Sequence, residues 1–87
     1  MRRKSFPRDI LNRLKWEEGL SLKDAEIVIL HRGAPNDRQR IMGKDVILIG
    51  HMFFDTPDAS IPFHRVLEIW HRGSKLFDRE DLRKTKE

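Results

Sequence analysis

The first part of the chain places apolar and polar residues with the period of an α-helix. The apolar positions at helical spacing are Ile10, Leu11, Leu14 and, as a further candidate, Phe6. Charged and amide side chains occupy the other side. Pro7 suits a first helical turn and Gly19 suits the position after a helix end, so the pattern predicts an amphipathic helix over Pro7–Trp16. We expect Trp16, at the end of this stripe, to lie in the core, although a tryptophan there could also stack on a base.

The rest of the chain carries short apolar runs between turn-forming residues, a pattern typical of β-strands. The predicted strands cover residues 25–31, 39–42, 46–49, 52–54, 61–63 continuing through 66–71, and 75–79. Turn residues at 55–60 and 72–74 predict hairpins. The pattern predicts an α+β fold, in which the N-terminal helix packs on a curved, mainly antiparallel sheet of four to six strands. A small sheet needs such a cover to be independently stable.

Length and composition narrow the class of protein. With 87 residues we expect a single domain over 1–87, with its core at about 6–79, a basic arm at 1–5 and a charged tail at 80–87. The absence of cysteine excludes disulfides and thiolate zinc sites and fits a reducing, cytoplasmic location. The sequence contains neither the apolar region of a signal peptide nor an apolar stretch of about twenty residues, so we expect no membrane partner.

The charge balance favours a polyanionic partner. The formal net charge is +4, from 18 basic and 14 acidic residues. The arm at residues 1–5 is either a solvated terminus or a source of sequence-independent phosphate contacts. RNA is the predicted partner, with RNA-processing proteins as further candidates.

Three of the four histidines are followed directly by arginine. His31-Arg32 follows a predicted strand, in a turn-rich loop, and His64-Arg65 lies near a predicted strand start. Arginine pairs bidentately with phosphate oxygens, and histidine can donate to an oxygen or stack on a base. We therefore predict a phosphate site built from His31, Arg32, Arg38, Arg40, His64 and Arg65. His51 and the third pair, His71-Arg72, are expected on the solvated surface.

We predict no catalytic residue, no metal and no cofactor. Two histidines can act as acid and base on a phosphodiester, but two-histidine phosphoesterases carry a hydroxyl residue two positions after each histidine. Here those positions are Gly33, Val66 and Gly73. HExxH spacing and glycine-rich nucleotide loops are absent, and adjacent arginines would repel a cation. Two alternatives stay open: a phosphodiesterase or cyclic-phosphate hydrolase using His31 and His64, and a protein-interaction module of an RNA-processing assembly.

Three segments together resemble a family of small, mostly archaeal proteins described as the RNA cyclic-group end-recognition domain. They are Ile10-Leu11-Asn12-Arg13-Leu14-Lys15-Trp16, Ile29-Leu30-His31-Arg32-Gly33-Ala34-Pro35-Asn36-Asp37 and Ile61-Pro62-Phe63-His64-Arg65-Val66. The resemblance spans roughly residues 6–79. It implies recognition of processed RNA ends, particularly a ribose 2′,3′-cyclic phosphate, in RNA repair or processing, and it maps onto His31, Arg32, His64 and Arg65.

Two positions depart from the family pattern. Glu17 follows Trp16 where the family often has Asp, and Phe63 stands where Tyr is usual. The missing hydroxyl removes one ligand contact at position 63, so we expect this side chain to serve in packing.

Overall fold

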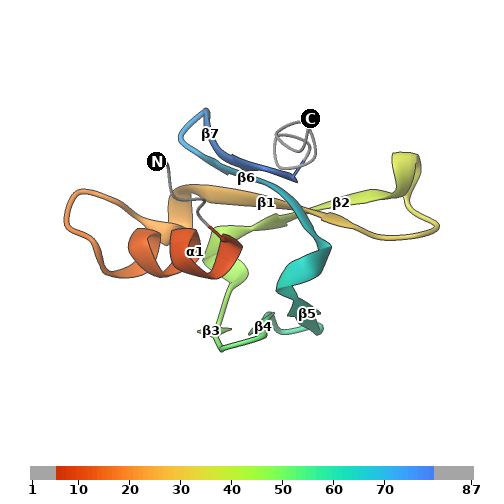
Figure 1. The fold of residues 1–87 in the computed structure, drawn as a ribbon, viewed down its shortest axis with the longest axis horizontal. Helices are drawn as coiled ribbons and strands as arrows, with labels where there is room; N and C mark the ends of the chain where they lie inside the picture. The colour runs from red at the N-terminus through yellow and green to blue at the C-terminus, as the bar shows by residue number, and fades with distance from the viewer. Residues whose placement is uncertain (1–5, 80–87) are drawn as a thin grey trace, which may run out of the picture.

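The computed structural model describes residues 6–79 and confirms an α+β fold, one helix followed by strands (Figure 1). Helix α1 spans Pro7–Trp16, as predicted, with Pro7 in its first turn. Within the described residues the strands are β1 (Ala25–Leu30), β2 (Arg38–Met42), β3 (Leu48–Ile49), β4 (Phe53–Asp55), β5 (Ser60–Pro62), β6 (Val66–His71) and β7 (Ser74–Asp78). The predicted arm at 1–5 and tail at 80–87 lie outside the described residues.

The strands form two antiparallel sheets. The larger sheet has the order β2-β1-β6-β7, and the smaller one has the order β3-β4-β5. Both predicted hairpins are present, as β4 paired with β5 and β6 paired with β7. The sequence pattern suggested one strand running from residue 61 to 71, whereas a 3₁₀ turn at Phe63–Arg65 separates β5 from β6. This turn carries the chain from the small sheet to the large one.

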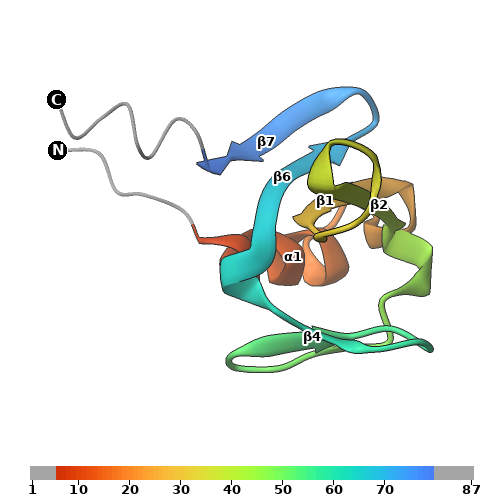
Figure 2. The same cartoon turned by 90° about the vertical axis from the view of Figure 1, so that its right-hand side faces the viewer.

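Helix α1 and the small sheet lie on the same side of the large sheet (Figures 1 and 2). The hydrophobic core fills the space that these three elements enclose. Its buried side chains come from α1, β1, β2, β4, β5, β6 and β7: Ile10, Leu11, Leu14, Ala25, Ile27, Ile29, Ile41, Phe54, Ile61, Val66, Ile69 and Phe77. In β1 the alternate residues Ala25, Ile27 and Ile29 therefore face inward, and the residues between them face the opposite side of the large sheet. In β6 Val66 and Ile69 both belong to the core although they are three positions apart, because the pairing of β6 with β1 shifts its register between Val28 and Ile29.

The predicted burial of Trp16 is wrong. Its side chain is 75% exposed, and Phe6 is 59% exposed. The reason is helical geometry: Trp16 lies two residues after Leu14, or about 200° around the helix, and so points away from the buried stripe. The Lys15 ammonium instead lies 5.1 Å from the centre of the Trp16 ring.

The predicted exposure of His71 is also wrong, since this residue is only 7% exposed. His71 is the last residue of β6 and repeats the inward direction of Ile69, two positions earlier. Its Nε2 accepts a hydrogen bond from the backbone N–H of Ser21 at 3.4 Å. Arg72 begins the turn and is exposed, as predicted, with its guanidinium paired to Asp24 at 2.9 Å.

Candidate functional site

A groove of about 600 Å³ lies between the β1–β2 hairpin and the turn that joins β4 to β5. Its lining residues are Ile29, His31, Gln39, Arg40, Ile41, Met42, Asp45, Thr56, Pro57, Asp58, Ala59, Ser60, Ile61 and Arg65. Ile29, Ile41 and Ile61 also belong to the core. The groove is therefore a continuation of the space between the sheets, beyond the point where apolar side chains fill it.

His31 reaches the groove from the first residue after β1. It follows the inward positions Ile27 and Ile29 in the alternation of that strand. Its backbone N–H donates to the carbonyl oxygen of Asp37 at 2.8 Å, and the Asp37 carboxylate accepts from the Gly33 N–H at 3.3 Å. Gly33 has a φ of 99°, in the left-handed region that favours glycine. The loop thus has a defined path that places His31 at its base.

Arg65 reaches the groove from the end of the 3₁₀ turn, directly before Val66, which pairs with Ile29 of β1. This turn is held by Arg79, whose guanidinium donates to the carbonyl oxygens of Val66 at 2.7 Å and Phe63 at 3.2 Å. Burial lowers the pKa of Arg79 below its ordinary value. The Phe63 ring packs against Phe54, with their centroids 5.8 Å apart. Arg79 and the aromatic pair together fix the segment that carries Arg65.

The structure brings together only part of the predicted phosphate site. His31, Arg40 and Arg65 line the groove, whereas Arg32, Arg38 and His64 are exposed outside its lining. The two His-Arg pairs therefore meet through one member each, the histidine of the first and the arginine of the second. In the first pair, His31 follows the inward alternation of β1 and Arg32 lies in the turn after it, whereas both members of the second pair lie in the 3₁₀ turn at Phe63–Arg65.

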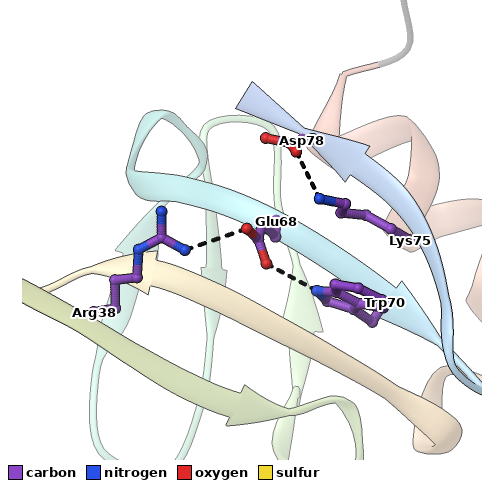
Figure 3. A network of polar contacts seen from close by, with 5 residues as sticks. All are labelled: Arg38, Glu68, Trp70, Lys75 and Asp78. Atoms are coloured by element: carbon purple, nitrogen blue, oxygen red, sulfur yellow. Dashed lines mark hydrogen bonds and ion pairs between the residues drawn. The ribbon is translucent and has the colours of Figure 1, made fainter. Parts of the chain in front are cut away.

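The guanidinium groups of Arg38 and Arg40 lie on the face of the large sheet that is turned away from the core. Arg38 Nη1 is 3.2 Å from Glu68 Oε2, and the other oxygen of Glu68 accepts from the Trp70 indole N–H at 2.9 Å (Figure 3). Arg40 Nη1 is 3.3 Å from Glu26 Oε1. A carboxylate already offsets part of the charge of each arginine, so Arg40 borders the groove with a weaker attraction for phosphate than an unpaired arginine has.

Three charged side chains that line the groove have no partner among residues 6–79. Arg65 forms neither an ion pair nor a side-chain hydrogen bond with another described residue, and among the arginines of residues 6–79 this is true also of Arg32. The carboxylates of Asp45 and Asp58 likewise have no partner within the described part of the chain. The groove can therefore offer a ligand both the hydrogen-bond donors of a guanidinium group and the acceptor oxygens of two carboxylates.

Sequence reasoning missed three contributors to this region. Arg79 was assigned to the end of a predicted strand, and Asp45 and Asp58 lay in turns where an acidic residue is ordinary. Arg79 acts through contacts with a distant segment, and Asp45 and Asp58 are brought to one groove by the fold, so no local pattern signals any of the three. The loop residues of β1–β2 were identified because charge and turn formers coincide there.

The described chain contains neither a metal cluster nor a membrane helix. Among residues 6–79, His, Asp and Glu side chains do not gather in groups of three or more that could hold a metal ion. No helix in the same range has the length and apolar character needed to span a bilayer.

Comparison with known proteins identifies the family. The sequence profile of the MJ1316 RNA cyclic group end recognition domain matches residues 1–79. The chain belongs to this family. The match covers both walls of the groove, and it confirms the resemblance seen in the sequence. No solved structure matches the chain significantly.

Archaeal relatives support the same assignment. A UPF0248 protein of Methanococcus vannielii is 38% identical over 77 residues, which cover 86% of this chain and 93% of the relative. The UPF0248 protein MJ1316 of Methanocaldococcus jannaschii is 44% identical over 64 residues, covering 71% and 76% of the two chains. A UPF0248 protein of Thermococcus sibiricus is 34% identical over 74 residues, covering 85% and 84%.

Proposed function

We propose that this chain is a non-catalytic RNA-binding module that recognises phosphorylated RNA ends, in particular a 2′,3′-cyclic phosphate, in cytoplasmic RNA processing or repair. The observation that carries the proposal is the meeting of His31 and Arg65 in one groove. The Arg65 guanidinium has no carboxylate partner among the described residues, so it is available to a phosphate. The description of the family supports RNA ends as the source of that phosphate.

Arg65 is the main phosphate ligand in this proposal. Its planar guanidinium would pair with two phosphate oxygens, and His31 would donate to one of them or to the ribose. Arg32 and His64 lie next to these residues in sequence and would contact the adjoining nucleotide. Arg38 and Arg40 would contribute less to the backbone path, because Glu68 and Glu26 already offset part of their charge.

The charges in the groove favour a cyclic phosphate over an open one. A 2′,3′-cyclic phosphate is a diester with a single negative charge, whereas a terminal phosphate monoester carries about −1.5 to −2 at pH 7. Asp45 and Asp58 line the same groove as Arg65. Their negative charges oppose a dianion more strongly than a monoanion, so the groove suits the cyclic end better.

The enzyme alternative requires His31 and His64 to act on the same phosphate. Only His31 lines the groove, while His64 is exposed outside the lining. Acid and base must both reach the reacting atoms, directly or through one water. The arrangement thus supports binding better than it supports hydrolysis.

Binding to matched short RNAs tests the proposal. At fixed salt, an RNA ending in a cyclic phosphate should bind more tightly than the same RNA ending in a linear phosphate or a hydroxyl. Arg65→Ala should weaken binding to the cyclic end by about 1–3 kcal/mol. Arg8→Ala removes the same charge from α1, where Arg8 pairs with Asp9 at 3.8 Å, and should leave the end preference intact.

Three outcomes would overturn parts of the proposal. Equal affinity for the three ends would exclude end recognition while leaving general RNA binding. Failure to bind any RNA would point to a protein-interaction module instead. Turnover of the cyclic end that is abolished by His31→Ala or His64→Ala would establish an enzyme.

A further inference from the structure

We propose that the groove also reads the base of the terminal nucleotide, and that Asp45 and Asp58 make it prefer guanine. The inference rests on the proposed function, because a bound RNA end would bring its last base into the same groove. A site of about 600 Å³ is within the range that encloses a small molecule such as a nucleotide. The phosphate ligand Arg65 occupies only part of the lining.

The two carboxylates are unusual in this chain because they are unpaired. Most carboxylates of residues 6–79 accept a hydrogen bond or form an ion pair, as Asp24 does with Arg72 and Asp55 does with Ser60. Asp45 and Asp58 have no such partner among the described residues, and both line the groove. Glu18 is also unpaired within that range, but it lies outside the groove lining. Two acceptors are therefore available where the ligand would lie.

The turn that carries Asp58 is ordered by its own hydrogen bonds. Thr56 Oγ1 accepts from the backbone N–H groups of Asp58 at 3.3 Å and Ala59 at 3.2 Å, and the Thr56 N–H donates to the Ala59 carbonyl at 2.8 Å. The backbone donors of this turn are thus already used, and they do not form a phosphate cradle. What the turn presents is the Asp58 carboxylate on an ordered backbone, so only the side chain has to be ordered on binding.

Apolar side chains supply a surface on which a base can pack. Met42 and Pro57 are exposed and line the groove beside the carboxylates, together with the almost fully buried Ile41 and Ile61. A nucleobase has apolar faces and a polar edge, so it gains from packing its faces while its edge meets the acceptors. Phosphate, base face and base edge therefore find complementary groups within one cavity.

Guanine is the base that fits carboxylate acceptors best. Its N1–H and N2 amino group lie side by side and match the two oxygens of a carboxylate. Adenine and cytosine present an amino donor beside a ring nitrogen that accepts. Uracil presents one N–H between two carbonyl oxygens, which a carboxylate repels. The expected order of affinity is guanine first, adenine and cytosine next, and uracil last.

Four short RNAs that share a cyclic-phosphate end and differ only in the terminal nucleoside test this order. We expect the guanosine-ended RNA to bind at least about tenfold more tightly than the uridine-ended one, which is the effect of one charge-assisted hydrogen bond. Asp58→Asn or Asp45→Asn should reduce this ratio, with binding of the uridine-ended RNA equal to or stronger than that of the wild type, because the negative charge that repels uracil and phosphate is removed. Glu18→Gln removes the same charge outside the groove and should leave the ratio unchanged. Circular dichroism checks that each variant is folded.

The outcomes separate the base preference from end recognition when hydroxyl-ended RNAs are included. Three results would overturn the proposed guanine preference and leave the cyclic-end preference standing. They are equal affinity for the four bases, a preference for uracil, and a guanine preference that neither Asp→Asn variant reduces. A guanine preference with equal affinity for cyclic and hydroxyl ends would support recognition of the base by the groove and exclude end recognition. Failure to bind any of these RNAs would overturn both.

Discussion

Arg79 offers the most direct test of how the groove is built, because it holds the turn at Phe63–Arg65 from a distant part of the chain. Arg79→Met keeps a long side chain to pack on Phe77, whose ring centre lies 5.5 Å from the guanidinium carbon. It removes the hydrogen bonds to the carbonyl oxygens of Val66 and Phe63. A hydrogen bond to a charged group contributes about 1.5–3 kcal/mol when solvent does not replace it.

Arg79 is only partly buried, so water will replace some of the hydrogen bonds that the two carbonyl oxygens lose. We therefore expect a loss of about 2 kcal/mol in the free energy of unfolding rather than the full sum. For a domain of this size, that loss lowers Tm by about 8–16 °C. Because the turn also orients Arg65, binding to a cyclic-phosphate RNA should weaken even at temperatures where the variant is folded.

Urea denaturation measures the first effect and RNA titration measures the second. Arg13→Met is the matched control, because Arg13 forms an exposed ion pair with Glu17 at 3.2 Å on α1. Such a pair contributes about 0.3–0.5 kcal/mol. If Arg79→Met and Arg13→Met lower the free energy of unfolding equally, the two carbonyl contacts do not stabilise the turn. If Arg79→Met destabilises the fold without changing RNA affinity, Arg79 does not position Arg65.

Two further predictions concern the fold itself. Gly43→Ala should lower the free energy of unfolding by about 1–3 kcal/mol or more, because Gly43 is buried and a Cβ there would collide with the backbone carbonyl oxygen of Leu22; a urea midpoint equal to that of the wild type would contradict this packing. Trp16→Ala should change the free energy of unfolding by less than about 0.5 kcal/mol, because Trp16 is 75% exposed; a loss typical of a core tryptophan, about 3–5 kcal/mol, would place the side chain in the interior instead.

Local periodicity was sufficient to predict most elements of the fold. The α1 stripe of Ile10, Leu11 and Leu14 and the β-branched run of β1 are signals that neighbouring residues carry by themselves. The division into two sheets was not predicted, because it depends on the 3₁₀ turn at Phe63–Arg65 and on a contact from Arg79, 14 residues after Arg65 in the sequence. His71 was misplaced because a residue at the end of a strand can belong either to the strand or to the turn.

The candidate site was predictable only as a set of chemical groups. Charge and turn chemistry identified His31 and Arg65, which line one groove. They could not show that Arg38 and Arg40 are paired with Glu68 and Glu26, since those partners come from other strands. For the same reason the sequence could not show that the carboxylates in the groove are unpaired, because this depends on the three-dimensional positions of all the charged side chains around them.

Strand β2 forms one edge of the large sheet, which leaves a row of its backbone groups without a neighbouring strand among the described residues. Exposed edges of this kind are where sheets of different molecules join and aggregate. Arg38, Gln39 and Arg40 make most of this edge polar, and Ile41 is its one buried side chain. A second molecule that paired with β2 would have to take these charged and amide side chains partly out of water, so they oppose aggregation along this edge whether or not they contact RNA.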